Sequence, residues 1–179
     1  MIQSEDRFHR YLQWLSGAPK VPTNTTALGG FPYLIRDGTV ASAYSQLITE
    51  IEGLQASAEV KEITKLAVTA HYKAKGEIVW LSRQIKTLST SQVQSIIKGV
   101  KPENLTREGA ASYDAVMYLI AIPGTLPRQY WENCFDTLGK DGTIGIIHLV
   151  GLHIGAAVIS NAVDAPVPSR GELLAMEEQ

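Results

Sequence analysis

The chain has 179 residues, of which 45% are apolar and 19% are charged, the balance of an ordinary globular protein. Its formal net charge of −2 lacks the basic excess of a nucleic-acid-binding surface, so no nucleic-acid partner is expected. This length suits one hydrophobic core, so we interpret residues 1–179 as a single domain, with an N-terminal helix and covering loop (1–35) and a tail (169–179). Met1–Arg10 lacks the pattern of a secretory signal, which makes a cytoplasmic location the expectation.

The first half of the chain contains three expected helices. Ser4–Ser16 has apolar residues at helical spacing and precedes a loop, Gly17–Leu34, rich in proline, glycine and threonine. A second helix is expected from Thr39 to Glu52. The longest runs from about Ala58 to Leu88, where an internal glycine, Gly76, indicates a packing contact, a ligand or a break.

The second half alternates apolar runs with capping residues and helix breakers. Four helices are expected there: one capped by Ser89–Ser91 and ending at Lys98, one from Thr106 to Ile122, one from Pro127 to Leu138, and, after a turn at Gly139–Thr143, a final helix Ile144–Val163. No run of strand-like alternation is visible. The expected fold class is therefore all-α, a compact bundle of about seven helices.

The final helix is long and apolar enough to cross a bilayer. However, it carries His148, His153, Ser160 and Asn161, and polar groups are costly in a lipid-facing span. Its small residues also allow close approach of neighbouring helices. We therefore expect no membrane contact, and interpret this helix as buried on all sides or placed at a subunit interface.

Several segments resemble the carboxymuconolactone decarboxylase-like and alkylhydroperoxidase-like group of proteins. The segments that carry the resemblance are Gly29–Leu34, Lys61–Val68, His71–Glu77, Leu138–Thr143 and Asn161–Pro168. The order and spacing of these segments match the group over roughly Gly29 to Pro168. The resemblance implies an all-helical fold that assembles as a homo-oligomer (dimer, trimer or hexamer), with an active site beside the long helix.

The resemblance also identifies four positions of the active site. The peroxidase branch has a cysteine pair, an earlier glutamate and a later histidine on the long helix; in this chain those positions hold Ala74, Glu77, Glu62 and Leu81. The only cysteine of the chain is Cys134, interpreted as a small buried residue, so thiol peroxidase chemistry is excluded. The decarboxylase-like branch keeps a glutamate and a histidine four residues later. Here Glu77 is kept and Leu81 replaces the histidine, which implies an altered reaction or lost activity.

Four residues are candidates for proton transfer. Glu77 lies among apolar neighbours, which raise the pKa of a carboxyl group and suit it to act as a general base; the alternative is an exposed glutamate paired with Lys73. His148 and His153 occupy an otherwise apolar helix but point about 140° apart, so they do not form a metal-chelating pair, and no metal is expected. We hypothesise that His153 replaces the histidine lost at Leu81. His71 is a further candidate.

The candidate substrate-binding residues surround Glu77 in the sequence. Lys73 and Arg83 could hold a substrate carboxylate or enolate oxygen, Trp80 could form an aromatic wall, and Tyr72 belongs to the family-like segment. For the two cations the alternative is a solvated helix face. No nucleotide-binding glycine motif or zinc-ligand cluster is visible, so no cofactor is expected.

Two functions remain open from the sequence. The first is a cofactor-free lyase or isomerase (decarboxylation, isomerisation, dehydration or cyclisation) that acts by acid–base catalysis on a small oxygenated organic acid or polyketide-like molecule, compatible with secondary metabolism or degradation. The second is a non-catalytic family member that acts in binding or assembly. A cavity that holds Glu77 and a histidine would favour the enzyme, and tightly packed side chains at these positions would favour the second.

Overall fold

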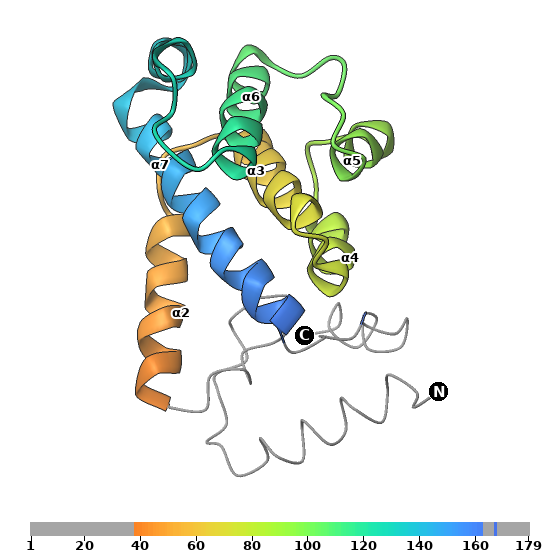
Figure 1. The fold of residues 1–179 in the computed structure, drawn as a ribbon, viewed down its shortest axis with the longest axis vertical. Helices are drawn as coiled ribbons and strands as arrows, with labels where there is room; N and C mark the ends of the chain where they lie inside the picture. The colour runs from red at the N-terminus through yellow and green to blue at the C-terminus, as the bar shows by residue number, and fades with distance from the viewer. Residues whose placement is uncertain (1–37, 163–166, 168–179) are drawn as a thin grey trace.

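The structure, a computed structural model, describes residues 38–162 and Val167. Within this part the protein is all-helical and contains no strand, which confirms the expected fold class. Its six helices are α2 (Gly38–Glu52), α3 (Ala58–His71), α4 (Lys75–Gln84), α5 (Thr90–Ile97), α6 (Arg107–Ala121) and α7 (Arg128–Ala162) (Figure 1). The helix expected at Ser4–Ser16, the covering loop and the tail lie outside the described residues.

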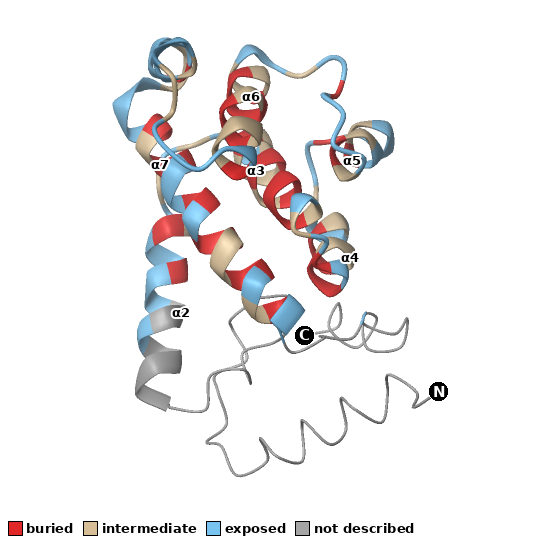
Figure 2. Cartoon of the chain, in the orientation of Figure 1, coloured by how far each residue is buried: buried red, intermediate tan, exposed pale blue. Residues whose placement is uncertain are grey.

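Helix α3 is the centre of the bundle. It packs against α4, α5, α6 and α7, while α2 packs along α7 (Figure 1). Figure 2 shows α3 buried around most of its surface. Its fully buried residues, together with side chains from α5, α6 and α7, form the main core: Val60, Ile63, Leu66, Val68, Ile96, Tyr113, Val116 and Ile146. A residue on α3 is therefore close to several other helices at once.

The starts of α5 and α6 follow the capping signals of the sequence. Ser89 and Gln92 form a reciprocal capping box at the start of α5, and Thr106 accepts a hydrogen bond from the Gly109 backbone N–H at the start of α6. The Glu59 carboxylate of α3 also binds the backbone and the hydroxyl of Thr106. These caps confirm two predicted helix starts and attach α6 to α3.

The expectation of one long helix from Ala58 to Leu88 is wrong. Helix α3 ends at His71, α4 begins at Lys75, and α4 ends at Gln84. Between the two helices, Lys73 adopts a left-handed backbone with φ of 57°. Its N–H donates to the Ala70 carbonyl (3.0 Å) and the Ala74 N–H donates to the Thr69 carbonyl (3.2 Å), the two hydrogen bonds of a Schellman helix end. Gly76 indicated a possible break, but the helix breaks three residues earlier, at Lys73, where the left-handed position normally holds glycine, and Gly76 lies in the first turn of α4.

The expected turn at Gly139–Thr143 is also shorter than predicted. Within α7 only Gly139 leaves the helical conformation, with φ of 70° and ψ of −179°, a region essentially restricted to glycine. The helix resumes directly afterwards. Thr143 is not a cap, because its hydroxyl donates to the Gly139 carbonyl at 2.7 Å. One glycine is thus sufficient to change the direction of the chain.

Helix α7 is only partly enclosed, so the first of the two alternatives, a helix buried on all sides, is wrong, and its placement at a subunit interface stays a prediction. Leu149 and His153 face the core, whereas Ile147, His148 and Val158 are exposed (Figure 2). The helix is long and apolar enough to span a membrane by length and composition, and 56% of its most apolar window is buried within the structure. The same properties are found in core helices of soluble proteins.

Candidate functional site

Glu77 is a buried carboxyl group in the first turn of α4. Its side chain is 2% exposed, and its Oε2 atom has no hydrogen-bond partner among the described residues. Burial raises its pKa from 4.5 to about 7, because the charged form loses its hydration. The alternative of a solvent-exposed glutamate paired with Lys73 is therefore wrong. A carboxyl group with this pKa can both accept and donate a proton near neutral pH.

A second polar cluster joins α2, α3 and α7. The Lys65 Nζ atom binds Glu52 Oε2 at 2.5 Å, and the other carboxylate oxygen, Oε1, faces His153 Nε2 at 3.9 Å. His153 is 1% exposed, while the Glu52 and Lys65 side chains are 25% and 21% exposed. Neither Glu52 Oε1 nor His153 Nε2 has a hydrogen-bond partner within the part of the chain that the structure describes. The partly exposed ion pair of Lys65 and Glu52 therefore lies next to the buried imidazole of His153.

The charges of this cluster follow from its geometry. Burial would raise the pKa of Glu52, but His153 and the Lys65 ammonium outweigh that effect and hold the pKa below its usual value. Burial lowers the pKa of His153, and the Lys65 charge adds to this effect, although Glu52 opposes it. At neutral pH the cluster therefore contains an ionised carboxylate beside a neutral imidazole.

A small cavity opens between α3 and α4 next to this cluster. Its volume is about 170 Å³, and it is lined by Ala58, Lys61, Glu62, Lys65, Leu81, Gln84 and Ile85. Both lysines of its wall bind Glu52: Lys65 binds the carboxylate, and Lys61 Nζ donates to the backbone carbonyl at 2.6 Å. The cavity is also lined by two of the four family-like positions, Glu62 and Leu81. Neither Glu77 nor His153 lines it.

Glu62 has a structural partner. Its carboxylate accepts hydrogen bonds from the backbone N–H groups of Lys86 (2.8 Å) and Thr87 (3.0 Å), and from the Thr87 hydroxyl. These bonds attach the segment after α4 to the start of α3. Glu62 is therefore engaged in holding the two sides of the cavity together.

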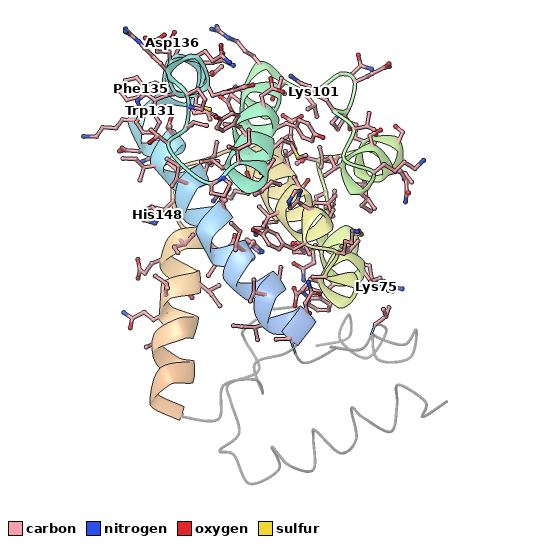
Figure 3. All side chains as sticks on the ribbon, viewed as in Figure 1. Lys75, Lys101, Trp131, Phe135, Asp136 and His148 are labelled. Carbon is pink, nitrogen blue, oxygen red and sulfur yellow. The ribbon has the colours of Figure 1, made fainter. Side chains whose placement is uncertain are left out.

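The other two histidine candidates, His148 and His71, lie outside the cavity between α3 and α4, as do Tyr72 and Lys73. His148 is exposed on the outer side of α7, away from α3 (Figure 3). His71 and Lys73 are also exposed, and they line a different cavity of about 210 Å³ beside the end of α5. Tyr72 is half-buried, and its carbonyl accepts a hydrogen bond from the Asn161 side chain at 2.6 Å. This bond ties the end of α7 to the break between α3 and α4.

The remaining substrate-binding candidates are on α4. Trp80 is buried and packs with Leu81, whereas Arg83 is exposed. Leu81 itself is 4% exposed and lines the cavity where the resemblance would place a histidine. The structure therefore groups Lys61, Lys65 and Leu81 around one cavity, but does not place Arg83 or Lys73 there.

Cys134 is buried, as expected from the sequence. It is 1% exposed, and its thiol contacts the Ala111 carbonyl at 3.6 Å. Burial, with a smaller contribution from Asp114, raises the pKa of the thiol to about 11, so it stays protonated at neutral pH. It is a core residue and not a nucleophile.

A larger apolar depression lies on the outer face where α6 and α7 meet. It has a volume of about 560 Å³ and is lined by Leu119, Thr125, Leu126, Arg128, Trp131 and Ile147. Trp131 and Phe135 are 39% and 45% exposed beside it (Figure 3). Exposed aromatic and aliphatic side chains next to a depression are typical of interaction surfaces.

Comparison with known proteins gives no relative for this chain. No family model, no curated protein and no solved structure matches it. The assignment of function therefore depends on the site geometry and on the resemblance of the sequence segments.

Proposed function

We propose that the protein is a cofactor-free lyase or isomerase that uses Glu77 as its general base and His153 as a second proton-transfer group. The substrate is a small oxygenated organic acid or polyketide-like molecule with its own electron sink, such as a β-keto or lactone acid. The chain would be a divergent member of the carboxymuconolactone decarboxylase-like group, without the cysteine pair, and would work as a homo-oligomer in the cytoplasm.

The observation that carries this proposal is the burial of Glu77 without a partner. A carboxyl group that is 2% exposed and has a pKa of about 7 costs stability, and its Oε2 atom has no hydrogen bond to a described residue that would offset the cost. Groups of this kind concentrate at catalytic sites, because a base is most efficient when its pKa is near the working pH.

The position of His153 adds support. It is buried on α7, a helix that contacts α4, and the Tyr72–Asn161 hydrogen bond fixes α7 against the segment just before Glu77. Of the two lysines that line the nearby cavity, Lys65 is ion-paired with Glu52, whereas Lys61 donates to a backbone carbonyl and supplies the positive charge for the carboxylate of an organic acid. In the proposed reaction Glu77 removes a proton next to the electron sink and, once protonated, returns that proton to the product, while the neutral imidazole of His153 takes up a second substrate proton and gives it back.

The test is turnover of candidate acids. Wild-type protein and Glu77→Gln would be incubated with β-keto and lactone acids, and CO₂ release and product mass would be followed. We expect turnover by the wild type and a loss of at least about 100-fold in Glu77→Gln, the range for a general base. Glu103→Gln, an exposed glutamate after α5, is the matched control and should keep full activity. Unchanged turnover in Glu77→Gln would remove Glu77 from the mechanism.

A second candidate function is non-catalytic assembly. It is favoured by the exposed apolar surface around Trp131 and Phe135, and by the absence of Glu77 and His153 from the walls of the cavity between α3 and α4. Light scattering would measure the oligomer of wild type and Trp131→Asp. An inactive protein whose oligomer dissociates in Trp131→Asp would favour assembly over catalysis.

A further inference from the structure

The most unusual pair of groups in the described chain is Glu52 and His153. Two buried polar atoms, Oε1 and Nε2, face each other at 3.9 Å, and no other residue in the described ranges forms a hydrogen bond with either of them. This distance is about 1 Å longer than a normal hydrogen bond, so a small side-chain movement would close it. Residues that face each other unpaired in this way are costly unless they bond to each other in some state of the protein.

We propose that Glu52 and Lys65 are positioning residues for His153: Lys65 keeps Glu52 ionised, and Glu52 holds the proton of the neutral imidazole on Nε2. A catalytic role for this arrangement rests on the proposed function, in which His153 transfers protons. Neither residue was a functional candidate from the sequence, because Glu52 ends α2 and Lys65 lies in the middle of α3.

The tautomer follows from the chemistry of the facing atoms. An ionised carboxylate oxygen only accepts hydrogen bonds, and a neutral imidazole carries its proton on one of two nitrogens. The arrangement with lowest energy therefore directs Nε2–H at Glu52 Oε1, and leaves Nδ1 as the proton acceptor. When Nδ1 takes a proton, the resulting imidazolium is stabilised by the Glu52 carboxylate, as in other carboxylate–histidine pairs.

The charged groups around the pair come from three helices. Glu52 is on α2, Lys65 and Lys61 are on α3, and His153 is on α7. Lys61 binds the backbone carbonyl of Glu52 and so fixes the end of α2. Because Lys65 also lines the cavity between α3 and α4, the chain Lys65–Glu52–His153 connects that cavity to the buried imidazole.

The test is NMR spectroscopy of the full-length protein labelled with ¹⁵N. Two-bond ¹H–¹⁵N correlations report the tautomer of each histidine, and loss of signals in His153→Gln identifies those of His153. In the wild type at pH 7 we expect the proton on Nε2.

In Glu52→Gln the side-chain amide can donate to Nε2, so the Nδ1–H tautomer should appear and the pKa of His153 should fall. In Lys65→Gln that pKa should rise, because the Lys65 charge lowers it in the wild type.

Two control variants make the same substitutions, Glu to Gln and Lys to Gln, at exposed positions outside the cluster. Glu50→Gln on α2 and Lys75→Gln on α4 remove exposed charges, and should leave the His153 signals unchanged (Figure 3 labels Lys75). Circular dichroism checks that each variant is folded. If Glu52→Gln does not fold, Glu52→Asp takes its place in the NMR measurement, because it keeps the charge but moves it away from His153 on a shorter side chain. A wild-type proton on Nδ1, or a titration of His153 that is the same in Glu52→Gln, would overturn the inference. Because no turnover is measured, failure here is distinct from failure of the proposed reaction.

Discussion

The buried carboxyl of Glu77 should make the protein lose stability as the pH rises. The perturbation is Glu77→Gln, which keeps the shape of the side chain and removes its ability to ionise. In the wild type the pKa of Glu77 is about 7 in the folded protein, against an ordinary value of 4.5, because burial disfavours the charged form. The two proteins should therefore respond differently to pH.

The sign and size of the effect follow from proton linkage. Below pH 4.5 the carboxyl group is protonated in both states and costs nothing. Between pH 4.5 and 7 the unfolded chain releases the proton while the folded protein keeps it, so the free energy of unfolding falls as the pH rises. Above pH 7 the loss is complete, and the difference between 4.5 and about 7 corresponds to about 3 kcal/mol.

The assay is urea denaturation of wild type and Glu77→Gln between pH 4 and pH 9, followed by circular dichroism. Groups common to both proteins cancel in the difference between their free energies of unfolding. We expect Glu77→Gln to gain about 3 kcal/mol relative to the wild type over this range, whereas Glu103→Gln should show a difference nearly independent of pH. If the difference for Glu77→Gln were also constant, Glu77 would have an ordinary pKa and the argument for a tuned base would fail.

Two further predictions concern backbone positions with positive φ. Lys73→Gly should raise the free energy of unfolding by about 1 kcal/mol, because glycine adopts the left-handed conformation of φ 57° without strain; a lower midpoint in urea would show that the Lys73 side chain is itself stabilising. Gly139→Ala should lower the free energy of unfolding by about 1–3 kcal/mol through backbone strain, because, apart from its chain neighbours and the adjoining helix backbone, no atom of the described residues lies within 4 Å of the added methyl group. An unchanged midpoint in Gly139→Ala would mean that α7 does not bend at this residue.

The helix starts could be predicted from the sequence because their signals are local. Ser89 and Thr106 cap the following helix with their own hydroxyl groups, so a few neighbouring residues contain all the information. The break at Lys73 carries no such signal. A lysine occupies the left-handed position where glycine is usual, and one contact that holds this helix end, from the Asn161 side chain to the Tyr72 carbonyl, comes from a residue far away in the sequence.

For the candidate site, too, the features that depend on local sequence could be predicted and those that depend on distant helices could not. The apolar neighbours of Glu77 correctly indicated a buried carboxyl group with a raised pKa. The cluster of Glu52, Lys65 and His153 could not be predicted, because its members come from three helices and no periodicity relates them. Both His148 and His153 were candidates from the sequence, and His153 was preferred only as a replacement for the histidine missing at Leu81. Only the packing of α7 separates them, since one faces solvent and the other faces the core.

The break between α3 and α4 is what creates the cavity beside the family-like positions. In one continuous helix, Glu62 and Leu81 would be separated by about 28 Å at 1.5 Å per residue, too far to line the same small cavity. The left-handed Lys73 turns α4 back along α3, so that both residues line a space of about 170 Å³ (Figure 1). The Glu62 bonds to Lys86 and Thr87 then hold the far end of α4 in place. The feature that makes the expected long helix wrong is therefore the same feature that brings Lys61 and Lys65 opposite Leu81.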